Sequence, residues 1–165
     1  MQPHLHPAAE AGPTPEDLPG GPACASAGSS EDRFNLLLPR VVAQVVGEGE
    51  PAREALRTGG FLVGESTVVM RLNPETDSLE FFCDIGLPLP WARESTLRAA
   101  MEMNLCRTHP GVTFGLHPES GRLVATTAMH MLLVADDEVC LNALALLTGV
   151  ARQRREDGTF RVTVD

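Results

Sequence analysis

The stretch from residue 78 to residue 134 constrains the fold more than any other part of the sequence. It opens with apolar and polar residues that alternate from Leu79 to Ile85, the period-two pattern of a half-buried strand. The segment GLPLP at 86–90 ends this strand, because proline lacks the N–H that a sheet ladder needs. The chain must therefore change direction near residue 90.

An amphipathic helix and a hairpin follow this break. The helix is predicted after Trp91, and one of its faces is made by five residues: Leu97, Ala100, Met101, Asn104 and Leu105. Two strand-like segments, 112–116 and 123–131, flank the turn sequence HPESG at 117–121. This order predicts a small antiparallel sheet with helices packed on it, which is an α+β fold.

A second amphipathic helix is predicted over residues 31–46, with Ser29 or Ser30 as its cap. Its apolar face contains Phe34, Leu37, Leu38, Val41, Val42 and Val45. Pro39 lies inside this pattern and is expected to kink or restart the helix. The apolar face is either part of the core or a surface that binds a partner.

Residues 66–72 predict a further strand, which a short turn joins to the strand that begins at Leu79 in an antiparallel hairpin. Phe82 falls on the same face of its strand as Glu80 and Asp84. An aromatic ring on such a face is either covered by another element or exposed for a partner. The pattern leaves both options open.

The last helix is predicted to begin at Asp136 or Asp137 and to end near Gly158, before a short strand at 159–164. Residues 47–60 are interpreted as a linker with room for one helical turn around 52–56. The predicted order is helix, two strands, helix, two strands, helix.

Composition separates a tail from a globular part. Residues 1–30 are rich in proline, glycine, alanine and serine and are predicted to be disordered, while residues 31–165 are predicted to form a single domain. The net charge is −9 and every basic residue is arginine, so phosphates and anionic lipids are repelled and neither nucleic acid nor membrane is an expected partner. No leader with a basic start and an apolar centre is visible, and we expect a cytoplasmic protein.

The sequence offers no convincing metal or nucleotide site, and no cofactor is expected. The segment GGFLVGES at 59–66 has the spacing of a phosphate-binding loop, but Glu65 stands where lysine is required. His4 and His6 lack further ligands, and Met101 and Met129 belong to apolar faces that favour core packing over copper binding. The four cysteines are far apart and form no CxxC pair, and three of them sit among apolar residues, which favours buried thiols in a reducing compartment.

Catalytic motifs are equally weak. The sequence contains no G-x-S-x-G elbow, no HExxH pair and no dinucleotide-binding fingerprint. We therefore do not expect an enzyme, although a small enzyme that uses a cleft histidine with a carboxylate stays a rival interpretation.

The segments DIGLPLP, MEMNL and FGLHPESGRLV, with a helix opening at DDE, resemble the Tir chaperone (CesT-like) family of class I type III secretion chaperones. The resemblance covers residues 60–155, and residues 31–46 more loosely. Near the C-terminus this chain has Gln153-Arg154 where the family has tryptophan and arginine. The resemblance implies a secretion-chaperone-like α+β fold and a cytoplasmic bacterial homodimer.

The implied function is to bind the extended N-proximal segment of a secreted effector and keep it soluble without ATP. The secretion apparatus's ATPase is a further partner that the resemblance implies. The predicted effector-binding residues are Phe34, Leu37, Leu38, Val41, Phe82, Val112, Phe114 and Val124. The dimer interface implied by the resemblance contains Leu97, Ala100, Met101 and Asn104. A second rival is a regulator with the same fold that sequesters a folded partner, such as a transcription regulator.

Overall fold

A computed structural model describes residues 28–163, so the predicted tail lies almost entirely outside the described residues. Its strands form an antiparallel sheet in the order β1–β2–β3–β5–β4, with β6 beside β3. The strands are β1 Gly60–Val63, β2 Ser66–Asn73, β3 Ser78–Pro88, β4 Thr113–Leu116, β5 Leu123–His130 and β6 Val162–Thr163. The α-helices are α1 Ser30–Val45, α2 Glu50–Thr58, α3 Arg93–Cys106 and α4 Asp137–Glu156, and two 3₁₀ turns are η2 Pro90–Ala92 and η3 Met131–Leu133.

The predicted α+β order is confirmed. Two further elements are present: α2 within the predicted linker, and β1 directly after it. Helix α2 occupies most of residues 47–60, and β1 then pairs with β2 across the turn that resembled a phosphate-binding loop. Pro51 in the first turn of α2 and Gly59 at its end, with φ +71°, are ordinary helix boundaries.

Helix α1 does not restart at Pro39, because it runs through this residue as one helix. Proline removes the hydrogen bond to the carbonyl of the residue four positions earlier, which is Asn35. Both Pro39 and Asn35 are exposed, so water can bond that carbonyl and the helix continues.

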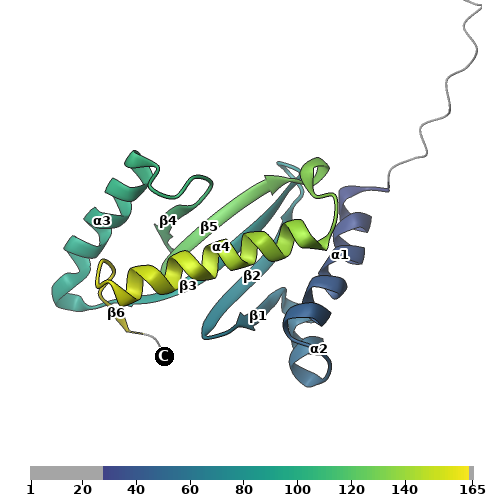
Figure 1. Cartoon of the computed structure of the whole chain (residues 1–165), viewed down its shortest axis with the longest axis horizontal. Helices are drawn as coiled ribbons and strands as arrows, with labels where there is room; N and C mark the ends of the chain where they lie inside the picture. The colour runs from purple at the N-terminus through teal and green to yellow at the C-terminus, as the bar shows by residue number, and fades with distance from the viewer. Residues whose placement is uncertain (1–27, 164–165) are drawn as a thin grey trace, which may run out of the picture.

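Helices α1 and α4 cover one face of the sheet (Figure 1). Alternate residues of β3 point to this face, and Leu79, Phe81, Cys83 and Ile85 are fully buried. The opposite face, here called the open sheet face, carries the intervening residues, among them Val69, Phe82 and Val124. This two-sided arrangement explains the alternating pattern in the sequence.

Polar contacts fix α1 against the start of α4. Ser29 caps α1 in a reciprocal pair of bonds with Asp32, and Asp136 caps α4 as the sequence predicts. The guanidinium of Arg33 donates to the carbonyl of Val134 at 2.7 Å. Asp137, in the first turn of α4, accepts hydrogen bonds from Arg40 and Gln44 on α1.

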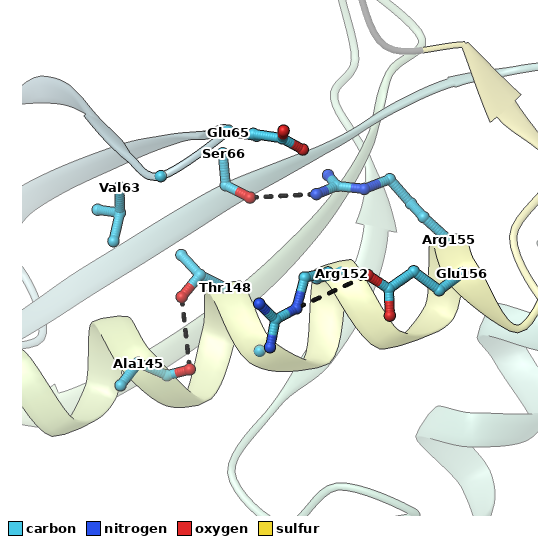
Figure 2. Close-up of a pocket in the computed structure, with 10 residues that line it drawn as sticks. Val63, Glu65, Ser66, Ala145, Thr148, Arg152, Arg155 and Glu156 are labelled. Atoms are coloured by element: carbon cyan, nitrogen blue, oxygen red, sulfur yellow. Dashed lines mark hydrogen bonds and ion pairs between the residues drawn. The ribbon is translucent and has the colours of Figure 1, made fainter.

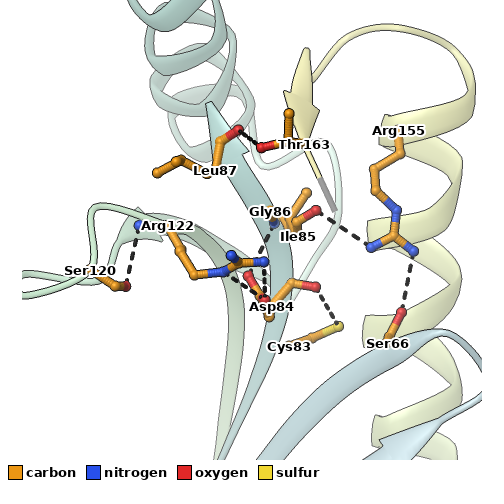
Figure 3. A network of polar contacts seen from close by, with 10 residues as sticks. All are labelled: Ser66, Cys83, Asp84, Ile85, Gly86, Leu87, Ser120, Arg122, Arg155 and Thr163. Carbon is orange, nitrogen blue, oxygen red and sulfur yellow. Dashed lines mark hydrogen bonds and ion pairs between the residues drawn. The ribbon is translucent and has the colours of Figure 1, made fainter. Parts of the chain in front are cut away.

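The end of β3 bends at Gly86, which has φ +134° and follows an irregularity in the pairing with β5. Asp84 holds this bend by accepting from the N–H of Gly86 at 3.0 Å and from Nε of Arg122 at 2.8 Å (Figure 3). On the other side, Leu87 pairs with Thr163 of β6. The bend thus lets one strand serve two neighbours at its end.

We expect Gly86→Ala to lower the free energy of unfolding by about 2–4 kcal/mol, because a positive φ and a steric clash act together. A Cβ at this position would lie 2.5 Å from the carbonyl oxygen of Thr163. The matched control is Gly64→Ala, where φ is +62° but no atom lies within 4 Å of the added Cβ, so we expect a loss of about 1 kcal/mol. Urea denaturation measures both. Equal losses would show that β6 does not restrict the bend.

Candidate protein-binding surfaces

The residues predicted to bind an effector divide among three parts of the molecule. Five of the eight are buried: Leu37, Leu38, Val41, Val112 and Phe114. Phe34, Phe82 and Val124 are half-buried. The structure therefore does not gather the set into one patch, and each part is described in turn.

A groove of about 640 Å³ lies between α1, α2 and β2, and is here called the α1–β2 groove. Its apolar lining consists of Phe34, Leu38, Leu56, Met70 and Leu72. Leu56 is 42% exposed, whereas Leu38 is 8% exposed and forms the base with Met70. Leu37 and Val41 are buried and absent from this lining. Of the predicted residues on the first helix, Phe34 and Leu38 therefore line a surface that a partner can reach.

The edge of β2 runs along this groove. Pairing between β1 and β2 begins at Gly60 with Val69, and the N–H of Met70 donates to the carbonyl of Gly59 at 2.8 Å. Alternate residues of a strand direct their backbone groups to the same side. The N–H and C=O of Leu72 therefore point to the same side of β2 as those of Met70, which is the side on which β1 pairs with β2. The residues before Gly59 belong to α2, so no strand covers Leu72 there. The groove thus combines apolar side chains with a short accessible strand edge.

Phe82 and Val124 lie together on the open sheet face. Both line a hollow of about 310 Å³ with Val69, Thr67 and the Asp84–Arg122 pair. The guanidinium of Arg71 lies 4.5 Å from the centre of the Phe82 ring, which is a cation–π contact. This arginine covers part of the ring and the rest is exposed. Phe82 is therefore neither fully covered by another element nor fully available to a partner.

Val112 and Phe114 belong to the covered face instead. The Phe114 ring packs edge-on against Phe160, with 5.2 Å between ring centroids, and is 5% exposed. Phe114 pairs with Ala125, so it points to the opposite face from Val124, the next residue back along β5. Expecting Phe114 and Val124 on one exposed surface was wrong, because side chains alternate between the faces of a sheet.

The four residues of the predicted dimer interface also separate. Ala100 is buried, and the side-chain amide of Asn104 donates to the carbonyl of Phe114 and accepts from its N–H, both at 2.8 Å. Leu97 and Met101 lie on the adjacent, more exposed side of α3 with Leu105, and together they form the α3 stripe. Met101 is 71% and Leu105 84% exposed. Beyond neighbouring η2, the principal contact of α3 is with β4, and α3 lies at one end of the molecule (Figure 1).

A further cavity, of about 660 Å³, lies between the β1–β2 turn and α4 (Figure 2). Arg155 donates to Oγ of Ser66 at 3.3 Å and to the carbonyl of Ile85 at 3.5 Å, while Arg152 lies 3.9 Å from Glu156. The lining mixes arginines with Glu65 and Glu156, and shows no nucleophile beside a base. We assign no chemistry to it.

Histidines and cysteines in the described region do not form a catalytic arrangement. Partial burial lowers the pKa of His109, and the Arg154 guanidinium, 3.0 Å from Nε2, lowers it further. His130 lies 3.7 Å from Asp77, which exceeds hydrogen-bond distance. Burial raises the pKa of the Cys83 thiol to about 11 and that of Cys140 to about 12, which leaves both protonated and unreactive at neutral pH.

Residues 28–163 contain neither a cluster of metal-binding side chains nor a helix that could span a membrane. No group of three or more histidine, cysteine, aspartate or glutamate side chains is arranged to hold a metal ion. Within the same residues, every helix is too short or too polar to cross a bilayer.

The antiparallel α+β fold of this chain is similar to that of chains in two solved protein complexes. No family model and no curated protein sequence matches the chain. A chain in the crystal structure of the ExsC–ExsE complex is 18% identical, with a TM-score of 0.60 over 76% of this chain and 92% of that one. A chain in the structure of the HopA1–SchA chaperone–effector complex is 13% identical, with a TM-score of 0.56 over 76% of this chain and 97% of that one. These likenesses confirm the predicted fold class, while membership of the Tir chaperone family stays a prediction.

Sequence reasoning missed Leu56 and Leu72 as lining residues of the groove. A signal for Leu56 was present, because Ala52, Ala55 and Leu56 have helical spacing between Pro51 and Gly59. No local signal marks Leu72, because the groove depends on where α1 crosses the sheet edge.

The Asn104 amide acts as a short substitute strand at the outer edge of β4. We expect Asn104→Ala to lower the free energy of unfolding by about 1–2 kcal/mol and to accelerate hydrogen exchange at the Phe114 amide, because two hydrogen bonds are lost. Exposed Glu102 on the same helix provides the control, since Glu102→Ala breaks none of these bonds. Unchanged exchange at Phe114 would contradict this role for Asn104.

Proposed function

We propose that this chain is a type III secretion chaperone that binds an extended segment of an effector protein in the α1–β2 groove. The supporting observation is the groove itself, which places apolar side chains beside an accessible strand edge on a fold shared with a chain of a chaperone–effector complex. The bound segment would stay soluble without ATP, because only its apolar side chains need to be covered. The proposed location is the bacterial cytoplasm.

Recognition would combine backbone and side-chain contacts. The N–H and C=O of Leu72 would pair with the backbone of the segment, as in other complexes where a peptide adds a strand to a sheet edge. Alternate side chains of the segment would then enter the space between Phe34, Leu38 and Leu56. Backbone pairing contributes affinity for many sequences, whereas the apolar groove selects segments with suitably spaced hydrophobic residues.

We test the groove with Leu56→Asp. A charge in an apolar groove loses hydration when a partner covers it, so we expect affinity for the partner segment to fall about tenfold to a hundredfold. The matched control is Leu36→Asp on α1, which is 72% exposed and absent from the groove lining. Both positions are exposed, so neither change should lower the melting temperature by more than a few degrees.

The partner for this measurement comes from affinity purification of the tagged chain from its native cytoplasm, followed by mass spectrometry. Limited proteolysis of the complex then maps the retained segment, and calorimetry compares the variants on that segment. An intact folded partner, with no protected extended segment, would favour the regulatory alternative. Equal affinity for both variants would place binding outside the groove.

We further propose that the chain forms a homodimer through the α3 stripe. Leu97, Met101 and Leu105 recur at helical spacing on one face of α3, where Met101 and Leu105 are largely exposed. Glu94, Arg98 and Glu102 border the stripe and would form its polar rim. Ala100 and Asn104, expected at the interface, instead anchor α3 to its own protomer.

The substitution Met101→Glu is expected to give a folded monomer, because a carboxylate in the middle of the stripe would be buried without a partner. Light scattering should show that the mass falls by half while circular dichroism stays unchanged. Leu36→Glu, an equally exposed site on another helix, should leave the mass as it is. A dimer that survives Met101→Glu would move the interface away from α3.

A further inference from the structure

The described chain begins at the rim of the α1–β2 groove. The first described residue is Gly28. Ser30 and Glu31 line the groove, together with Phe34 one turn further along α1. The peptide bond to residue 27 therefore leaves the described chain close to this groove. A tether of about ten residues gives an effective concentration in the millimolar range, so even weak binding to the groove becomes appreciable.

One segment of these residues has the character of a groove ligand. The sequence PEDLP at 15–19 contains Leu18, which with Leu5 makes up the large aliphatic residues between positions 2 and 27. Leu18 precedes Pro19, and residues before proline favour extended backbone. Glu16, Asp17 and Leu18 keep the N–H groups needed for strand pairing, whereas the flanking prolines limit its length.

The position of the segment in the sequence also suits the groove. Gly20 and Gly21 lie between the segment and α1, and a glycine pair allows the chain to turn back along the helix. Arg57 and Arg71 line the groove, each paired with one exposed or half-buried glutamate. Both arginines are already paired with Glu54 and Glu80, and Glu31 and Asp77 add two further carboxylates. Charge therefore does not favour Glu16 and Asp17, and Leu18 has to provide the affinity.

We infer that residues 15–19 of this chain bind in the α1–β2 groove, with Leu18 between Phe34 and Leu56, and so compete with an external segment. This inference rests on the proposed function, because it assigns an internal competitor to the proposed effector site. Effector binding would then require displacement of the chain's own segment. Segments that bind the groove more weakly than the tethered one would be rejected.

The test is paramagnetic relaxation in the full-length chain. A spin label is attached through Gly20→Cys after Cys24 and Cys106 are replaced by serine, while the buried thiols of Cys83 and Cys140 stay unlabelled. We expect the methyl signals of Leu56 and Leu72 to lose about half of their intensity or more, because the bound segment holds the label beside them. The methyl signals of Leu105 on distant α3 should be unchanged.

The decisive control keeps the label and adds Leu18→Asp, which removes the apolar anchor but not the tether. Signals of Leu56 and Leu72 should then recover. Persistent broadening in this variant would show that proximity alone, or the region of Leu5, causes the effect, and the inference would be overturned. Absence of broadening in the first labelled chain would overturn it as well. Neither result needs an effector. If residues 15–19 do not bind the groove, the effect of Leu56→Asp on affinity for the effector segment still tests the proposed function.

Discussion

The pairing of β3 with three other strands is the constraint on which the rest of the structure depends. β3 lies between β2 and β5 along most of its length and meets β6 after the bend at Gly86. Its inward residues from Leu79 to Ile85 are fully buried under α4. Because the central strand is buried on one face only, the opposite face keeps partly exposed residues such as Phe82. The same strand therefore determines both the core and the open sheet face.

The two edges of this sheet are treated differently. The β4 edge is occupied at Phe114 by the Asn104 amide, which forms the two bonds that a neighbouring strand would form. At the other edge, β1 covers β2 only as far as Gly59, so within the described residues no strand pairs with β2 at Leu72 on that side. Accessible edges attract unwanted strands, so proteins usually protect them. An edge that is protected on one side and accessible beside an apolar groove on the other is well suited to selective strand addition.

Local patterns predicted the elements of this fold well and their surroundings poorly. Alternation in residues 79–85 and the turn at 117–121 predicted β3 and the β4–β5 hairpin, because strand periodicity is written in adjacent residues. The exposure of Phe114 was wrong, since a one-residue difference reverses the face and only the pairing with β5 fixes it. Asn104 appeared on an apolar helix face, but its amide serves a strand ten residues away. Contacts of this kind depend on tertiary placement, which no window of sequence contains.

Helix α1 is held by hydrogen bonds on one side and by apolar contacts on the other. This difference affects which side chains the α1–β2 groove could accommodate. Arg33, Arg40 and Gln44 bind the start of α4 on one side, so that side of the helix is fixed by directional bonds. Phe34 and Leu38 face the groove on the other side through apolar contacts alone, which have no preferred direction. A small rotation about the fixed side would widen or narrow the groove without breaking a polar bond. A wall of this kind would let the proposed site accept hydrophobic side chains of different volume.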